Sequence, residues 1–203
     1  MKKILLAALP LAAIAVMAFT SISEPLPIGA SLPNADTKMK DISGKEVSFK
    51  DAAKKNGLLV MFSCNTCPVV KKYQARTLES AKLAAGKGIG VILLNPNEAT
   101  RSTGDSYDDM KAYGKAQGYD FSYVVDENSA MADAFGATRT PEVFLFDKNN
   151  KLVYHGAIDA NQDAPDDKDT RKHLNIAIEE LSSGKAIETT TTRSVGCGIK
   201  RAK

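Results

Sequence analysis

One short stretch decides how this chain is expected to fold, and it reads Val60-Met61-Phe62-Ser63-Cys64-Asn65-Thr66-Cys67-Pro68-Val69-Val70. An apolar run ends in two cysteines separated by two residues, and a helical pattern begins directly after them. A C-x-x-C at a strand-to-helix turn is typical of a thiol–disulfide redox centre, because two thiols in the first helical turn can close a small disulfide ring. The N–H groups and dipole at a helix N-terminus favour the reactive thiolate, and Lys71 and Lys72 add positive charge one turn further on. We therefore predict a redox-active pair, with Cys64 as the more exposed and attacking thiol.

Two other interpretations of the cysteine pair are half of a zinc site and a structural disulfide. Zinc would need two further ligands. The rest of the chain offers Cys197, His155 and His173, without a second C-x-x-C or an H-x-x-H. These ligand counts favour redox chemistry, and no metal or other cofactor is expected.

The first 23 residues have the pattern of a secretory signal peptide. Lys2 and Lys3 form a basic start, an apolar stretch covers residues 4–19, and small or polar residues cover 20–23. The apolar stretch is short for a membrane span. We expect export to the bacterial periplasm, with no membrane association beyond this leader.

The net charge and the expected oxidising compartment limit the functions that remain. The net charge of the 203-residue chain is +3, and removal of Lys2 and Lys3 lowers it to +1. A nearly neutral domain gives no electrostatic reason to expect nucleic-acid binding. In an oxidising compartment a C-x-x-C needs a thiol partner that donates electrons, or it remains a disulfide.

The order of expected elements indicates one α/β domain over residues 24–188, followed by a tail over 189–203. Two short strands are expected within 37–49, around a turn at 43–45. Further strands are expected at 58–62, 89–94, 123–125, 143–146 and 152–154, and helices at 51–56, 68–85, 105–117, 128–135 and 168–183. This alternation predicts a central, partly parallel sheet flanked by helices.

Two motifs carry a resemblance to a known fold. They are Phe62-Ser63-Cys64-Asn65-Thr66-Cys67-Pro68 and Gly136-Ala137-Thr138-Arg139-Thr140-Pro141-Glu142-Val143-Phe144-Leu145-Phe146-Asp147. Over residues 28–200 the chain resembles exported thioredoxin-like redoxins of the alkyl hydroperoxide reductase/thiol-specific antioxidant superfamily. Asn95-Pro96-Asn97 and the tail Ser194-Val195-Gly196-Cys197-Gly198-Ile199-Lys200 are similar to a subgroup with a C-N-x-C-P site and a G-C-x-I-K tail.

The resemblance implies a thioredoxin-like fold with a central mixed sheet and an N-terminal β-hairpin extension. It also implies that Pro141 is a cis-proline opposite the cysteine pair. A cis bond would expose the backbone of Thr140, so that a substrate chain could pair with it as an added strand. The alternative is a trans proline that starts a strand.

The chain also departs from its relatives. Leu58 stands where thioredoxins carry a buried acid, so the usual proton shuttle is missing. Glu142 is a candidate substitute, although a solvated carboxylate at a strand end is the favoured role. The peroxiredoxin pattern P-x-x-x-T/S-x-x-C is absent, because Gly57 and Met61 occupy its positions before Cys64.

Three functions follow from these residues. The favoured one is a thiol–disulfide oxidoreductase, acting as a reductant on a protein or small-molecule disulfide, in which Cys64 attacks and Cys67 resolves the mixed disulfide. The second is a thiol-dependent, antioxidant peroxidase, in which Cys64 becomes a sulfenic acid. The third is a copper-binding chaperone that would use His155, where a half-exposed structural histidine is favoured instead.

Cys197 is the thiol left over, and it has two interpretations. Gly196 and Gly198 beside it permit close approach to another surface, so the tail could fold back towards Cys64 and Cys67 as a third redox cysteine, or bond a partner chain. The favoured interpretation is a packed, unreactive residue that ties the tail to the domain, because free cysteines are often buried.

Overall fold

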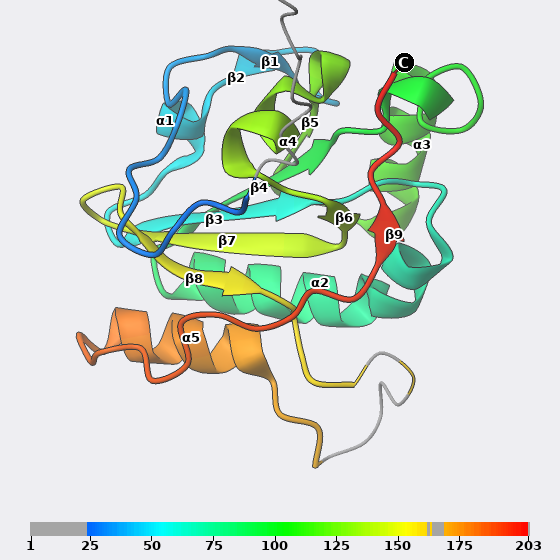
Figure 1. Cartoon of the computed structure of the whole chain (residues 1–203). Coiled ribbons are helices and arrows are strands. Elements are labelled where there is room, and N and C mark those ends of the chain that lie inside the picture. The colour runs from blue at the N-terminus through cyan, green and yellow to red at the C-terminus, as the bar shows by residue number, and fades with distance from the viewer. Residues whose placement is uncertain (1–23, 162, 164–168, 203) are drawn as a thin grey trace, which may run out of the picture.

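The computed structural model describes residues 24–161, 163 and 169–202, so the predicted signal peptide lies outside the described residues. A five-stranded sheet in the order β5-β4-β3-β7-β8 forms the centre of the molecule (Figure 1). The strands are β3 (Gly57–Phe62), β4 (Gly90–Asn95), β5 (Ser122–Val125), β7 (Glu142–Asp147) and β8 (Leu152–Gly156). The β3, β4 and β5 strands are parallel, whereas β7 runs antiparallel to both β3 and β8. The predicted mixed sheet is confirmed.

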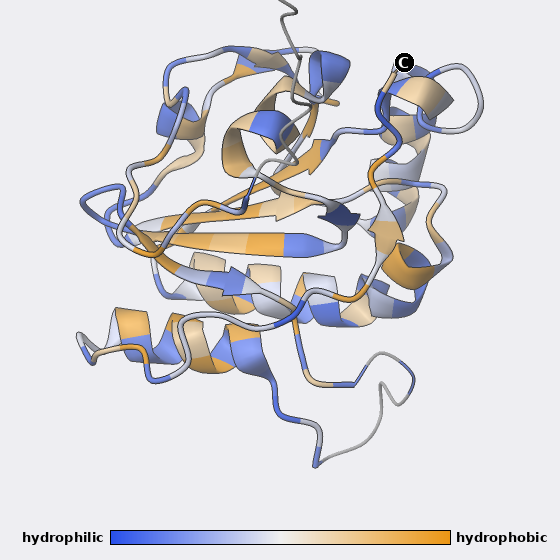
Figure 2. Cartoon of the chain, viewed as in Figure 1, coloured by the Kyte–Doolittle hydropathy of each residue, from blue (hydrophilic) through white to orange (hydrophobic). Residues whose placement is uncertain are grey.

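Helices cover both faces of this sheet because the central strands are apolar on both sides. On one face the side chains of Leu59 and Met61 pack with α2 (Pro68–Gly86), α3 (Tyr107–Gln117) and α5 (His173–Ser182). On the other face Leu58, Val60 and Phe62 pack with α1 (Phe49–Ala52) and α4 (Ala130–Phe135). Figure 2 shows mostly hydrophobic central strands, and helices in which hydrophobic and hydrophilic residues are mixed. The β3 strand, and the turn that follows it, are therefore held from two sides.

The helix boundaries differ from prediction where caps or backbone angles decide them. The helix expected at 51–56 runs from Phe49 to Ala52 instead, and a capping box formed by Ser48 and Asp51 fixes its start. The helix expected at 128–135 begins at Ala130, since Asn128 and Ser129 have positive φ angles. They belong to a short 3₁₀ segment, η2 (Glu127–Ser129), and a second one, η1 (Glu98–Thr100), follows β4. Among the described residues the last helix begins at His173.

Two small strand pairs complete the fold. The predicted N-terminal hairpin is confirmed as β1 (Met39–Lys40) and β2 (Glu46–Val47), which are antiparallel. The other pair joins β6 (Arg139–Thr140) to β9 (Cys197–Gly198) in the C-terminal tail. The tail runs from α5 past β8, where Thr191 bridges His155, and reaches β6 at the end of the sheet (Figure 1). No helix in the described part of the chain is long and apolar enough to cross a membrane.

Candidate redox site

The two cysteines of the C-x-x-C occupy the turn between β3 and α2. Cys67 is the N-cap residue of α2, and Pro68 opens the helix, a position where its missing N–H leaves no bond unmade. Both cysteines are buried, with Cys64 at 0% and Cys67 at 4% exposure. The prediction that Cys64 is exposed is wrong for this state of the molecule.

Thr140, the residue before Pro141, lies against both sulfurs. The peptide bond between Thr140 and Pro141 is cis. The Sγ of Cys64 is 3.3 Å from Oγ1 of Thr140, and the thiol and hydroxyl can each donate this hydrogen bond. The Sγ of Cys67 lies 3.4 Å from the backbone oxygen of Thr140. The predicted free edge at Thr140 is not observed, because this residue pairs with Cys197 and is fully buried.

The disulfide of the structure links Cys67 to Cys197, and the thiol of Cys64 is free. Cys64 and Cys67 are therefore not bonded to each other. The favoured interpretation of Cys197, as a packed and unreactive residue, is wrong. The alternative, in which the tail folds back to the pair, describes what is observed. All three cysteines pack together with Val70, so a free thiol and a disulfide share one small apolar cluster.

Burial raises the pKa of the Cys64 thiol above its ordinary value of 9.0. A hydrogen bond with Thr140 acts in the opposite direction, and the negative charge of Asp105 adds to the increase. Lys71 and Lys72 are exposed to solvent, where water screens their charges. The backbone N–H groups of Thr66 and Cys67 at the start of the helix lower this pKa as predicted, but burial outweighs them while the tail covers the site, so the predicted net lowering is wrong.

A buried carboxylate holds the loop between the cysteines from behind. Asp105 is 0% exposed, and its two oxygens accept five hydrogen bonds. The donors are the backbone N–H of Asn65 (2.8 Å), the side-chain amides of Asn95 (2.9 Å) and Asn97 (3.3 Å), and the hydroxyls of Thr66 (2.8 Å) and Thr100 (2.8 Å). Burial raises the pKa of Asp105, but the hydrogen bonds outweigh it and hold that pKa below its ordinary value. The carboxylate is thus an ionised group that fixes both residues between the cysteines.

Sequence reasoning missed Asp105, and a signal for it was present. Asn95 ends β4, which is parallel to β3, so the residues after both strands meet at one edge of the sheet. Polar residues after neighbouring parallel strands were therefore candidates for one cluster. The hydroxyl of Tyr123 also reaches this cluster, by donating to the side-chain oxygen of Asn65 at 2.9 Å.

Glu142 is a buried structural acid, which corrects its predicted role as a solvated carboxylate. It is 3% exposed. One of its oxygens accepts hydrogen bonds from the backbone N–H groups of Thr138 (2.8 Å) and Arg139 (3.0 Å). The other lies 2.7 Å from Nε2 of His155, which is buried rather than half-exposed and stacks on Phe144. Glu142 and His155 therefore fix the segment that leads into Pro141.

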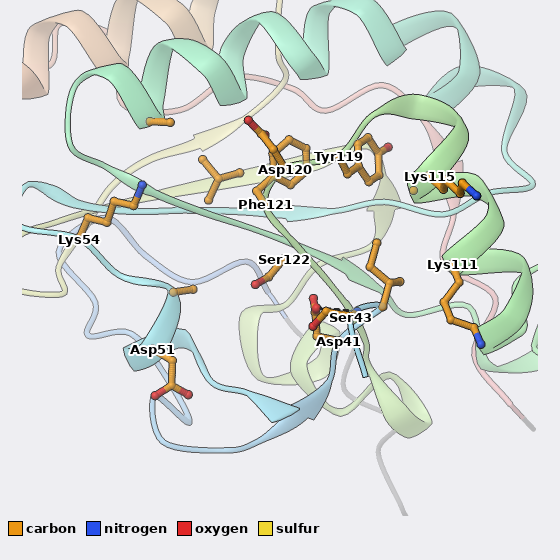
Figure 3. Close-up of a pocket in the computed structure, with 15 residues that line it drawn as sticks. Asp41, Ser43, Asp51, Lys54, Lys111, Lys115, Tyr119, Asp120, Phe121 and Ser122 are labelled. Carbon is orange, nitrogen blue, oxygen red and sulfur yellow. Dashed lines mark hydrogen bonds between the residues drawn. The ribbon is translucent and has the colours of Figure 1, made fainter. Parts of the chain in front are cut away.

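A hollow on the protein lies away from the cysteines, and it does not identify a ligand. It measures about 850 Å³, and the labelled side chains in Figure 3 include Lys54 at one end and Lys111 and Lys115 at the other. None of the cysteines lines it. Among the described residues, no group of three His, Cys, Asp or Glu side chains lies close enough together to hold a metal ion.

Comparison with known proteins places these features in a family. Residues 27–174 match the family model described as Redoxin. The chain is 26% identical over 133 residues to the thiol-disulfide oxidoreductase ResA of Bacillus subtilis (strain 168), and the match spans 66% of each protein. A hypothetical protein of Sinorhizobium meliloti 1021 has a crystal structure that matches with a TM-score of 0.79 at 32% identity, over 89% of this chain and 97% of that one. The thioredoxin domain of a thiol-disulfide oxidoreductase from Bacteroides vulgatus has a TM-score of 0.53 at 20% identity, over 64% and 88% of the two chains. The fold is thioredoxin-like.

Proposed function

The chain belongs to the redoxin family of oxidoreductases, and we propose that it is an exported thiol–disulfide oxidoreductase that works as a reductant through Cys64 and Cys67. The observation that carries the proposal is the cluster in which the free thiol of Cys64 packs against the disulfide of Cys67 and Cys197. A thiol and a disulfide in one cluster are the two reactants of thiol–disulfide exchange. The printed name of the Bacillus relative and the leader pattern of residues 1–23 support the activity and the export.

The proposed reaction begins from the reduced pair. The thiolate of Cys64 attacks one sulfur of the substrate disulfide, and the electron pair of the broken bond leaves on the other substrate sulfur, which takes a proton. Cys67, as a thiolate, then attacks the Sγ of Cys64. A bond between the two cysteines forms, and the substrate leaves as a thiol. The substrate gains two electrons, and a thiol partner must return two electrons to the enzyme.

The surroundings of the pair support these roles. The hydroxyl of Thr140 lies 3.3 Å from the Sγ of Cys64, where it can donate a hydrogen bond to a thiolate. That bond lowers the pKa of Cys64. Asp105 holds the backbone of Asn65, so the loop keeps the two cysteines at fixed positions during exchange. The disulfide with Cys197 must open before Cys67 can resolve a mixed disulfide.

A peroxidase and a copper chaperone stay as alternatives to be tested. Nothing in the cluster favours the peroxidase, because the positions where peroxiredoxins carry Pro and Thr hold Gly57 and Met61. The proposed copper ligand His155 already contacts Glu142 through Nε2. These observations leave disulfide exchange as the function that the site supports best.

Reduction of insulin disulfides by the full chain, with dithiothreitol as electron donor, tests the proposal. We expect catalysed reduction by the natural protein and the background rate with Cys64→Ser. Peroxide consumption and Cu(I) titration are measured on the same samples. A protein that consumes peroxide or binds Cu(I) tightly, but leaves insulin at the background rate, would refute disulfide exchange as its function.

A further inference from the structure

The C-terminal tail covers the surface beside Pro141, and what it does there has a consequence for substrates. We propose that residues 194–199, here called the tail segment, occupy the binding surface of a protein substrate, and that tail and substrate compete for it. The substrate class that we infer is an extended polypeptide whose cysteine directly follows a glycine. This inference rests on the proposed function and deepens it.

The tail segment has the form that a bound substrate would have. Its strand β9 pairs antiparallel with β6, with Cys197 opposite Thr140 and Gly198 opposite Arg139. The backbone N–H of Ile199 donates to the oxygen of Thr138 at 3.0 Å. Backbone pairing of this kind accepts many sequences, because the side chains take no part in it. The sulfur of Cys197 bonds to Cys67, and Cys64, the proposed attacking thiol, packs in the same cluster. An extended strand on this surface therefore brings its cysteine next to both members of the redox pair.

The contact at Gly196 gives this surface a specific requirement. A methyl group on Gly196 would overlap the backbone oxygen of Thr140 and its carbonyl carbon, which are rigid parts of the site. A methyl group on Gly198 would meet nothing within 4 Å. The residue before the cysteine must therefore be glycine, whereas the residue after it is free to carry a side chain.

A reductant can reach the disulfide between Cys67 and Cys197 through the sulfur of Cys197. Cys197 is partly exposed, whereas Cys67 and Cys64 are buried. A reducing dithiol therefore attacks the Sγ of Cys197, the bond to Cys67 breaks, and the electron pair leaves on the sulfur of Cys67. The second thiol of the reductant then releases Cys197 as a thiol and becomes a disulfide itself.

Other contacts keep the released tail close to the site. Before the tail segment, the backbone N–H of His155 donates to Thr190, and that of Thr192 donates to His155, each at 3.0 Å. After it, Arg201 forms an ion pair with Asp133 at 2.7 Å. A tethered strand has a high effective concentration at its own site. The tail therefore competes with external chains even when no disulfide holds it.

Three short peptides test the requirement for glycine. Each carries its cysteine as a mixed disulfide with thionitrobenzoate, whose release is followed by colour. The first has the tail sequence Ser-Val-Gly-Cys-Gly-Ile-Lys. The second replaces the glycine before cysteine with alanine, and the third, its matched control, replaces the glycine after it. We expect reduced full-length protein to attack the first and third at similar rates and the second about tenfold more slowly, as an overlap in a packed contact requires.

A small disulfide without a peptide, dithiobis(nitrobenzoate), distinguishes failure of this inference from failure of the proposed disulfide exchange. Equal rates with all three peptides would overturn the inference. Reaction with the small disulfide but with none of the peptides would also overturn it and leave the proposed function standing. If the small disulfide is untouched as well, the proposed function fails, and the inference fails with it.

Two variants of the full chain test the competition itself. Gly196→Ala should weaken docking of the tail, and Gly198→Ala serves as the matched control. In glutathione buffers, we expect the equilibrium between reduced protein and the Cys67–Cys197 disulfide to shift about tenfold towards the reduced form for Gly196→Ala. Gly198→Ala should stay within about twofold of the natural protein. Reduced Gly196→Ala should also attack the first peptide faster than the natural protein does. Identical equilibria and rates in both variants would refute competition by the tail.

Discussion

The carboxylate of Asp105 accepts a hydrogen bond from the backbone N–H of Asn65 over 2.8 Å, and this bond ties the loop between the two cysteines to the residues that follow β4. Asp105 is ionised while buried, because its five donors replace the water that it has lost. The carboxylate therefore affects both the stability of the site and the charge that Cys64 experiences.

Asp105→Asn should lower the free energy of unfolding by about 1–3 kcal/mol, since an amide cannot accept from all five donors. It should also lower the pKa of Cys64, because the charge of Asp105 raises that pKa in the natural protein. Urea unfolding and thiolate absorbance against pH measure the two effects. Asp108→Asn is the matched control, since Asp108 is exposed and pairs with Lys111 at the surface. An unchanged pKa in Asp105→Asn would contradict the electrostatic role.

Alkylation of Cys64 in the protein with its tail bonded should depend steeply on pH. The folded-state pKa of this thiol lies above its ordinary value of 9.0 because of burial, so we expect slow labelling at pH 7 and a half-maximal rate above pH 9. The same shift means that the thiol contributes stability below pH 9, which is lost as pH rises through the folded-state pKa. Iodoacetamide labelling with peptide mass spectrometry measures it. Labelling that is already maximal at pH 7 would contradict the prediction.

Replacing Cys64 and Cys67 separately should distinguish the attacking from the resolving thiol. Cys64→Ser should abolish dithiol-dependent reduction of a model disulfide, and Cys67→Ser should accumulate mixed disulfides. Because Cys67→Ser also frees Cys197, the double variant with Cys197→Ser shows whether the adduct is on Cys64. Non-reducing gels followed by mass spectrometry identify the linkage. Adducts that accumulate in Cys64→Ser instead would reverse the roles.

Glu142→Ala should destabilise the fold by about 1–3 kcal/mol, because it leaves the backbone N–H groups of Thr138 and Arg139, and the buried ring of His155, without their partner. Glu142→Gln keeps one side-chain oxygen and should lose less. Urea unfolding of the two variants gives the comparison. If the alanine variant is as stable as the natural protein, water has replaced the carboxylate, and the segment before Pro141 does not depend on it.

The sequence predicted the sheet and the position of the cysteine pair because both depend on local patterns. The apolar strands, the C-x-x-C and Thr140-Pro141 all carry their signal within a few residues. The roles of Glu142 and His155 were wrong because both depend on contacts across the sheet, where β7 and β8 pair. The predictions that Cys64 is exposed and has a lowered pKa were wrong because the thiol is buried in a cluster that includes Cys197 of the tail. No pattern near residue 64 contains information about residue 197.

The bond between Cys67 and Cys197 joins residues that are 130 positions apart, and it closes residues 67–197 into a covalent ring. That ring encloses four of the five strands of the central sheet and every helix from α2 to α5. Closing so large a loop removes about 5 kcal/mol of conformational entropy from the unfolded chain. The oxidised protein is thus the durable form, and the reduced protein, which is ready for chemistry, is the form most open to unfolding and proteolysis. Half-life in the presence of proteases should accordingly follow the redox state of a single bond.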